Sequence, residues 1–202
     1  DYCFTGDGEN SLSKFVVNTE CRNFSHDILK GIPGLVFRSN GKIVKNPEEL
    51  IADLDSIPFP RWDLMPPTSY PKSPHGAFFR QFPYAAMYAT RGCPFPCTFC
   101  AASKVSGKSI RHRSLENIME EIKLLRNNYG VKEIHFEDDN FSVKKKLLIE
   151  FCETLLKEDL GITWCFPNGL RLEMLDLDNL RLMRRAGCYA VNVGVESGSD
   201  RI

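Results

Sequence analysis

The sequence predicts an α/β protein whose larger part is a partial (β/α) barrel of the TIM type, built on parallel strands. Three observations support this fold class. From Tyr84 onward, short apolar segments alternate with longer segments that have apolar residues at helical spacing. Strands that alternate with helices become parallel neighbours, because each helix serves as the crossover between two of them. Polar residues and cysteines directly follow the apolar segments, which is where parallel sheets bind their ligands.

Four strand and helix units are expected between residues 84 and 202, the last without its helix. The expected strands are residues 84–89, 131–136, 162–166 and 189–195. The expected helices are residues 114–130, 142–160 and 176–188, and Ser114 is positioned to cap the first of them. A closed barrel of this type takes roughly 250 residues. The chain is therefore expected to stop inside this domain, after the fourth strand.

The N-terminal part of the chain has a different sequence pattern. It contains a glycine-rich turn at residues 6–10, a helix start at residues 11–18 and a hairpin around Asn40 and Gly41. The segment that follows is rich in prolines, which prevent a regular helix: Pro58, Pro60, Pro66, Pro67, Pro71 and Pro74. The predicted organisation is a front domain part at 1–45, a linker at 46–83 and a barrel domain at 84–202.

The composition of the chain argues against a nucleic-acid partner and a membrane span. The chain has 26 basic and 26 acidic residues, and this balance argues against binding driven by broad attraction to phosphates. No apolar stretch approaches the roughly 20 residues that a membrane helix needs. The first residues lack the basic start and apolar run of a signal peptide. We expect a cytoplasmic protein with no membrane span and no nucleic-acid partner.

The distribution of the 8 cysteines favours a metal site over disulfides. Three of them crowd into the segment TRGCPFPCTFCAAS. The others are scattered through ordinary sequence: Cys3, Cys21, Cys152, Cys165 and Cys188. Cys165 and Cys188 lie in or beside apolar strands and are expected to be small core residues.

The crowded cysteines, Cys93, Cys97 and Cys100, have the spacing CxxxCxxC directly after the first expected strand of the barrel. A structural zinc site is usually closed by four ligands, and a fully ligated iron-sulfur cluster needs four cysteines. Three cysteines on one loop can instead hold three irons of a cubane and leave the fourth iron open. Pro94 and Pro96 stiffen the loop, so that the sulfurs converge with little loss of entropy.

This loop resembles the signature of the radical S-adenosylmethionine (SAM) superfamily. In that family SAM chelates the open iron of a 4Fe-4S cluster, and its reductive cleavage yields a 5'-deoxyadenosyl radical that abstracts hydrogen from the substrate. The resemblance implies that Cys93, Cys97 and Cys100 are the metal ligands and that Phe99 lies near the adenine of SAM. It further implies a small-molecule substrate and an electron donor such as flavodoxin or ferredoxin. No catalytic residue is identified.

Polar residues at the end of the second strand form the run Glu137, Asp138, Asp139 and Asn140. Acids there can bind an ammonium group or a cation, and they can also cap the following helix. The resemblance implies that this position holds the SAM amino group, often through Gly-Gly-Glu. Here Asp138, Asp139 and Asn140 align with that element, so the usual form is absent.

The ends of the third and fourth strands supply further candidates. Arg171 can meet a carboxylate through its planar fork of donors, or it can pair with Glu173 or Asp176 at the surface. Glu196, followed by Ser197, can accept two hydrogen bonds from ribose hydroxyls, which is the role that the resemblance implies for this strand end.

The front of the chain resembles the end of the Rossmann-like cobalamin-binding domain, and the linker, that precede the barrel in cobalamin-type radical SAM enzymes. Gly6, Asp7, Gly8 and Glu9 carry this match, and a simple β-turn is the alternative. That class includes methylases and the anaerobic magnesium-protoporphyrin ester cyclase. The resemblance therefore adds cobalamin as a cofactor and methyl transfer or oxidative cyclisation as the reaction. The first phosphate-contacting loops of such a domain are expected to lie before Asp1.

Two other functions stay open at the level of sequence. One is a non-catalytic zinc-binding module in which Cys93, Cys97, Cys100 and His112 form a closed shell. The other is a radical SAM enzyme of the methylthiotransferase type, which has a similar loop but a different front domain. The proline-rich linker and the hairpin argue against this second alternative by analogy.

Overall fold

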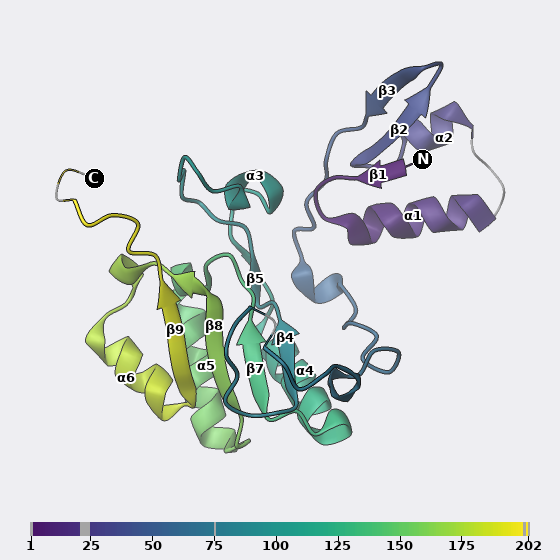
Figure 1. The fold of residues 1–202 in the computed structure, drawn as a ribbon. Coiled ribbons are helices and arrows are strands. Elements are labelled where there is room, and N and C mark those ends of the chain that lie inside the picture. Colours follow the sequence, from purple (N-terminus) through teal and green to yellow (C-terminus); the bar gives the residue numbers. More distant parts are fainter. Residues whose placement is uncertain (1, 21–24, 75, 200, 202) are drawn as a thin grey trace. The chain divides into compact units, whose positions relative to one another are not determined.

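The computed structural model of the chain describes residues 2–20, 25–74, 76–199 and 201 (Figure 1). Cys21, Asp1 and Ile202, which entered the expectations above, lie outside these ranges. The chain divides into two compact units, Asp1–Ile57 with Gly92–Arg111 and Pro58–Arg91 with His112–Ile202. Within the described ranges no helix has both the length and the apolar character needed to cross a membrane.

The first unit contains a three-stranded antiparallel sheet in the order β1-β2-β3. Its elements are β1 (Tyr2–Phe4), α1 (Gly8–Glu20), α2 (His26–Lys30), β2 (Leu35–Ser39) and β3 (Lys42–Lys45). A small apolar core forms where α2 meets the sheet: Leu29, Ile32, Leu35 and Phe37. The helix expected near residues 11–18 is confirmed as part of α1.

The hairpin expected around Asn40 and Gly41 is also confirmed, because these two residues join β2 to β3. Their φ angles are 49° and 75°. A two-residue hairpin loop of the common type needs positive φ at both central residues, which asparagine and glycine tolerate best. This local requirement explains why the sequence alone located the turn.

The proline-rich segment forms no α-helix or strand among residues 46–74 and 76–83, as its prolines predict. It contains two short 3-10 turns, Leu54–Ser56 and Pro67–Ser69. Trp62 in this segment donates a hydrogen bond of 2.9 Å from its indole Nε1 to Glu121 Oε1, and Glu121 also pairs with Arg113 at 2.6 Å. The segment is therefore ordered against the helix that carries Glu121.

The second unit is built on a four-stranded sheet in the order β4-β7-β8-β9, in which all neighbours are parallel. The strands are β4 (Tyr84–Met87), β7 (Glu133–Phe136), β8 (Thr163–Leu170) and β9 (Cys188–Val193). The intervening helices are α4 (Leu115–Tyr129), α5 (Lys145–Glu158) and α6 (Leu177–Arg185) (Figure 1). This confirms the predicted α/β architecture of parallel strands joined by helical crossovers. The shorter elements are β5 (Thr90–Arg91), α3 (Ala102–Val105) and β6 (Arg111–His112).

Local capping sets the helix boundaries. Ser114 caps α4 as predicted, because its hydroxyl oxygen accepts a hydrogen bond from the Asn117 N–H at 3.1 Å. Asp176 caps α6 in the same way through the Asn179 N–H at 2.8 Å. The α5 helix begins later than expected, at Lys145, because Phe141–Val143 form a 3-10 turn first.

The two faces of the parallel sheet differ in chemistry. Side chains alternate across a strand, so Ile134 and Phe136 of β7 point to one face with Trp164 and Phe166 of β8. There they join Phe151 of α5 in an aromatic cluster, with ring centroids 5.3 Å apart for the pairs that Phe151 forms with Phe136 and Trp164. The opposite face carries polar groups instead.

The prediction that Cys165 is a core residue needs one correction, because Cys165 lies on this polar face. Cys165 and Cys188 are both buried, as expected. Cys188 packs in the apolar core together with Cys152. Cys165 lies on the polar face, where its sulfur is 3.6 Å from the Tyr189 hydroxyl.

Candidate active site

The cysteine loop begins at Gly92, immediately after β5, and its backbone is tightly constrained. Gly92 has a φ of 97°, and a Cβ at this position would clash with the carbonyl oxygen of Ser109. The N–H of Cys93 donates to the carbonyl oxygen of Gly107 at 3.0 Å. A Cβ at Gly107 would in turn lie 2.5 Å from Leu50 Cδ1. The outgoing and returning arms of the loop are thus held together at its base.

The three cysteines carry thiols within this constrained loop, with Cys93 and Cys97 half-buried and Cys100 exposed. A turn joins the last two, because the Cys100 N–H donates to the Cys97 carbonyl oxygen at 3.2 Å. The N–H of Ala102, at the start of α3, points to Cys100 Sγ at 3.4 Å. One backbone donor is thus aimed at the sulfur of the third cysteine.

The thiols of the loop suit a cluster better than a closed zinc ion. The loop offers three cysteines, Cys93, Cys97 and Cys100, whereas a structural zinc site usually has four ligands. A 4Fe-4S cubane bound by three cysteines keeps one iron open, so this donor set fits such a cluster.

Phe99, the aromatic residue before the last cysteine, is 74% exposed. Its ring is therefore available to pack against a flat partner. The exposure is unusual for a phenylalanine, because large apolar side chains are normally buried.

An ion pair that the sequence did not reveal anchors the returning arm of the loop. Arg111 and Asp7 are both buried, and the Arg111 Nη1 donates to Asp7 Oδ2 and to the Ile51 carbonyl oxygen, the latter at 2.8 Å. Its Nη2 donates to the Ser106 carbonyl oxygen at 2.7 Å. Asp7 also accepts from the Ile51 N–H at 2.8 Å. Asp7, one of the four residues that resemble the cobalamin-type domain, thus also stabilises the cysteine loop.

Asp138, at the end of β7, is buried and bound by neighbouring donors. Its carboxylate accepts hydrogen bonds from the N–H groups of Ala89 and Thr90 and from the Thr90 hydroxyl, the last at 2.7 Å. Burial raises the pKa of Asp138 to about 7, although these hydrogen bonds favour its ionised form. The contacts tie the end of β7 to the segment that leads into the cysteine loop. The side chain of Asp138 therefore supports the site.

The other residues of this run differ in whether their side chains are available to bind a ligand. Asn140 is buried and accepts a hydrogen bond from the Ser142 hydroxyl at 2.6 Å. Asp139 is exposed. Glu137 Oε1 is buried, and no described residue donates a hydrogen bond to it. A buried carboxylate oxygen without a donor is costly, so this atom fits a site that a cationic ligand completes.

The end of β8 lies beside the end of β7. The side-chain amide of Asn168 donates to the Glu137 carbonyl oxygen at 2.9 Å, which joins the two strand ends. Arg171, just beyond β8, pairs with Glu173 through its Nε at 2.7 Å. The surface ion pair considered in the sequence analysis therefore forms, and Asp176 instead caps α6 and pairs with Lys145 at 2.6 Å.

The segment after β9 places Glu196 and Ser197 in a tight turn. Glu196 has a φ of 60°, and its carboxylate folds back to where a Cβ of Gly194 would stand. The Ser197 N–H donates to the Val195 carbonyl oxygen at 2.6 Å. Glu196 is exposed and Ser197 is half-buried, so both side chains are accessible to a ligand.

Comparison with known proteins agrees with this geometry. Residues 87–202 match the model of the Radical SAM superfamily. The chain is 37% identical over 175 residues to the uncharacterized methyltransferase PH0819 of Pyrococcus horikoshii, covering 86% of this chain and 36% of the relative. It is 27% identical to the anaerobic magnesium-protoporphyrin IX monomethyl ester cyclase of Synechocystis, covering 99% of this chain and 38% of the relative.

A solved structure has the same fold. The radical SAM methyltransferase TsrM of Kitasatospora setae, with cobalamin and a 4Fe-4S cluster bound, superposes with a TM-score of 0.70 at 17% identity, covering 96% of this chain and 38% of that one. The present chain thus spans little more than a third of the length of these proteins. The family match begins at Met87 in β4 and includes the cysteine loop and the ends of the parallel strands. The chain belongs to the radical SAM superfamily.

Proposed function

We propose that this chain forms the cluster-binding and SAM-binding part of a radical SAM enzyme, with Cys93, Cys97 and Cys100 as ligands of a 4Fe-4S cluster. When bound, the cluster and SAM supply reductive cleavage to a 5'-deoxyadenosyl radical. The observation that carries the proposal is the three-thiol loop, constrained at its base and lying inside the segment that matches the family model. A closed zinc module is not favoured, because the match to the radical SAM family includes the cysteine loop.

The loop backbone presents the three sulfurs. The Cys93 N–H, held by the Gly107 carbonyl, sets the position of the first cysteine, and the turn from Cys97 to Cys100 sets the other two. The Ala102 N–H is aimed at the sulfur of Cys100, at 3.4 Å. These contacts orient the ligands before the cluster arrives, so that little conformational entropy is lost on binding.

The strand ends supply the remaining contacts to SAM. Glu137 and Asp139 offer carboxylate oxygens for its ammonium group, while Asp138 and Asn140 position the end of β7 through Thr90 and Ser142. This assignment keeps the predicted segment and gives the direct contact to Glu137 and Asp139.

The nucleoside part of SAM would meet three other predicted residues. Phe99 packs on the adenine ring, and Glu196 accepts from the ribose hydroxyls with Ser197 beside it. Arg171 can bind the SAM carboxylate only if its ion pair with Glu173, which is present in this structure, breaks.

Methyl transfer is the reaction class that the relatives favour, because PH0819 and TsrM are both described as methyltransferases. Oxidative cyclisation is the second candidate, because the cyclase aligns with 99% of the chain. The same relatives make cobalamin the further cofactor that we propose. No described residue is assigned to the corrin. The methylthiotransferase alternative is not favoured by these relatives.

The proposal extends to partners and location. The substrate is a small molecule, and a flavodoxin or ferredoxin supplies the electron. We place the protein in the cytoplasm, where the thiols remain reduced and available to iron.

SAM cleavage tests this proposal. The enzyme is reconstituted anaerobically with iron and sulfide, reduced with dithionite and supplied with SAM, and 5'-deoxyadenosine is quantified. Turnover is expected in the parent enzyme and in Cys3→Ala, which removes an exposed thiol outside the loop. It is expected to vanish in Cys97→Ala. Full activity of Cys97→Ala would rule out the assigned ligand set.

Glu137→Gln separates the SAM contact from the cluster. This variant is expected to retain iron and sulfide but to require a higher SAM concentration for half-maximal cleavage, because the amide is neutral toward the ammonium group. An unchanged SAM requirement would remove Glu137 from the site.

A further inference from the structure

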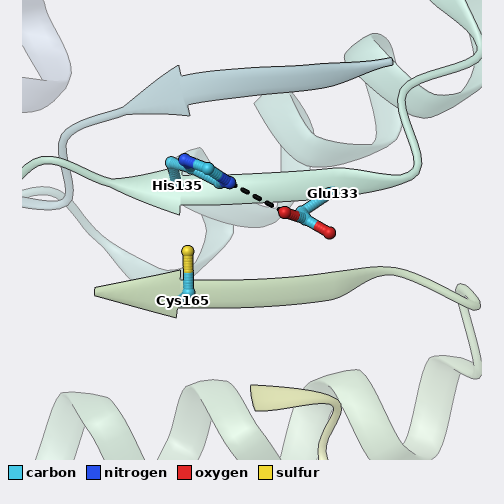
Figure 2. Close-up of side chains that lie close together, drawn as sticks. All are labelled: Glu133, His135 and Cys165. Atoms are coloured by element: carbon cyan, nitrogen blue, oxygen red, sulfur yellow. Dashed lines mark hydrogen bonds and ion pairs between the residues drawn. The ribbon is translucent and has the colours of Figure 1, made fainter. Parts of the chain in front are cut away.

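A second group of metal-ligating side chains lies on the polar face of the parallel sheet, opposite the aromatic cluster. Figure 2 shows Glu133 and His135 on one strand and Cys165 on its neighbour, with their side chains gathered between the strands. The carboxylate oxygen, the imidazole nitrogen and the thiol sulfur all lie within 4.8 Å of one another, and all three residues are buried. We propose that this trio binds one divalent transition-metal ion, with zinc as the best match. The site is independent of the iron-sulfur cluster and goes beyond the function proposed above.

The strand register brings the three residues together. Glu133 and His135 are two residues apart on β7, so they point to the same face. In the parallel pairing of β7 with β8, His135 lies opposite Cys165. The backbone hydrogen bonds of the sheet therefore determine the spacing of the ligands, which does not depend on a flexible loop.

The imidazole and the carboxylate need only a small adjustment to accept an ion. The His135 Nε2 is 2.8 Å from Glu133 Oε1. Zinc bonds of about 2.0–2.3 Å in tetrahedral geometry place neighbouring ligand atoms roughly 3.3–3.8 Å apart. These two atoms would therefore separate by about half an ångström. The Tyr189 hydroxyl is 2.7 Å from Glu133 Oε1 and 3.6 Å from Cys165 Sγ, so a fourth oxygen is near two of the three ligands.

Surrounding groups hold the ligands in place, as the outer contacts of metal sites do. The Glu133 carboxylate accepts from the N–H groups of Arg80 and Gln81 at 3.0 and 2.7 Å and from the Thr163 hydroxyl at 2.9 Å. The His135 ring stacks on Tyr84, with centroids 4.8 Å apart and an interplanar angle of 14°. Carboxylate and imidazole are thus already oriented.

Ligand type favours zinc, and the charge of the site permits it. A thiolate and a carboxylate carry two negative charges, so a dication keeps the buried trio neutral, as the ion pair of His135 with Glu133 does without a metal. Metal binding would displace the protons that otherwise balance this site, as thiol and imidazole ligands require. Thiolate and imidazole prefer zinc and related transition metals over magnesium or calcium. Because the ligands come from two paired strands, the ion would cross-link β7 and β8.

Cobalt binding tests the site without interference from the cluster loop. The chain carrying Cys93→Ala, Cys97→Ala and Cys100→Ala is stripped with a chelator and titrated with Co²⁺, which reports thiolate ligation through a charge-transfer band. One ion per chain is expected, displaced by Zn²⁺. Adding Cys165→Ala is expected to abolish the charge-transfer band and to weaken binding by roughly tenfold or more. Cys188→Ala, at another buried thiol, is the matched control and is expected to bind normally.

Two further results decide the proposal. Glu133→Gln keeps the shape of the side chain, so it should fold, as circular dichroism would verify, and should bind Co²⁺ more weakly while the thiolate band persists. Absence of the charge-transfer band from the Cys188→Ala control and its parent would overturn the proposal. A band that survives Cys165→Ala would overturn it equally, because the sulfur ligand would then be another cysteine. Neither result depends on whether the loop binds an iron-sulfur cluster.

Discussion

The buried carboxylate of Asp138 has structural partners, so its replacement should destabilise the protein. Asp138→Ala leaves the N–H groups of Ala89 and Thr90 buried without an acceptor. Each such group costs about 1–3 kcal/mol, so the free energy of unfolding should fall by roughly 2–6 kcal/mol. Asp139→Ala, at the exposed neighbour, should change it by no more than about 0.5 kcal/mol. Chemical denaturation of both variants measures the difference, and equal effects would contradict the support role of Asp138.

Arg111 provides a second prediction at the scale of single residues. Arg111→Ala leaves the Asp7 carboxylate buried without its cation, which typically costs about 3–5 kcal/mol in the free energy of unfolding. Arg111→Lys should recover only part of this loss, because one ammonium cannot replace a guanidinium that reaches Asp7, Ile51 and Ser106 together. Urea denaturation compares the two variants with the parent. Full recovery by lysine would show that charge alone matters.

The sequence revealed the proposed cluster ligands better than it revealed the residues that hold the surrounding structure in place. The spacing of Cys93, Cys97 and Cys100 is local and could be interpreted directly. The partners of Asp7 and Asp138 lie 104 and 48 residues away along the chain, and no local pattern connects them. The Glu133 and His135 alternation on β7 was visible in the sequence, but its meaning depends on the register with Cys165.

At the scale of elements, the base of the cysteine loop depends on the absence of a side chain at Gly92. Gly92→Ala should displace the loop, because its methyl group would meet the Ser109 carbonyl at a φ of 97°. We expect the variant to incorporate much less iron and sulfide on reconstitution while far-ultraviolet circular dichroism stays close to that of the parent.

Gly198→Ala is the control for this change, since no atom of the described residues, apart from its own chain neighbours, lies within 4 Å of the position that its Cβ would take. It should incorporate iron and sulfide normally. If Gly92→Ala also did so, the close approach of the two loop arms would not matter for the cluster.

The strands and helices of the second unit were largely predictable, since their apolar periodicity is local. The differences lie at boundaries that depend on tertiary contacts. The strand expected to end at Phe166 continues as β8 to Leu170 through register irregularities against β9. The helix expected from Ser142 begins at Lys145, because Phe141 turns into the aromatic cluster first.

For the whole molecule, the parallel order β4-β7-β8-β9 followed from the alternation of strands and helices. The division into units did not, because Gly92–Arg111 groups with the front of the chain although its sequence interrupts the barrel-like segment. The cause is the set of contacts from Arg111 and Gly107 to residues 7, 50 and 51. Such contacts between distant segments have no periodic signature in the sequence.

The central claim is that Cys93, Cys97 and Cys100 hold a 4Fe-4S cluster with one iron open to SAM. Electron paramagnetic resonance of the anaerobically reconstituted and reduced enzyme, recorded before and after addition of SAM, tests it most directly. We predict the signal of a reduced 4Fe-4S cluster that changes on addition of SAM, persists in Cys3→Ala and disappears in Cys97→Ala. A cluster signal that does not respond to SAM, or one that remains in Cys97→Ala, would contradict the account.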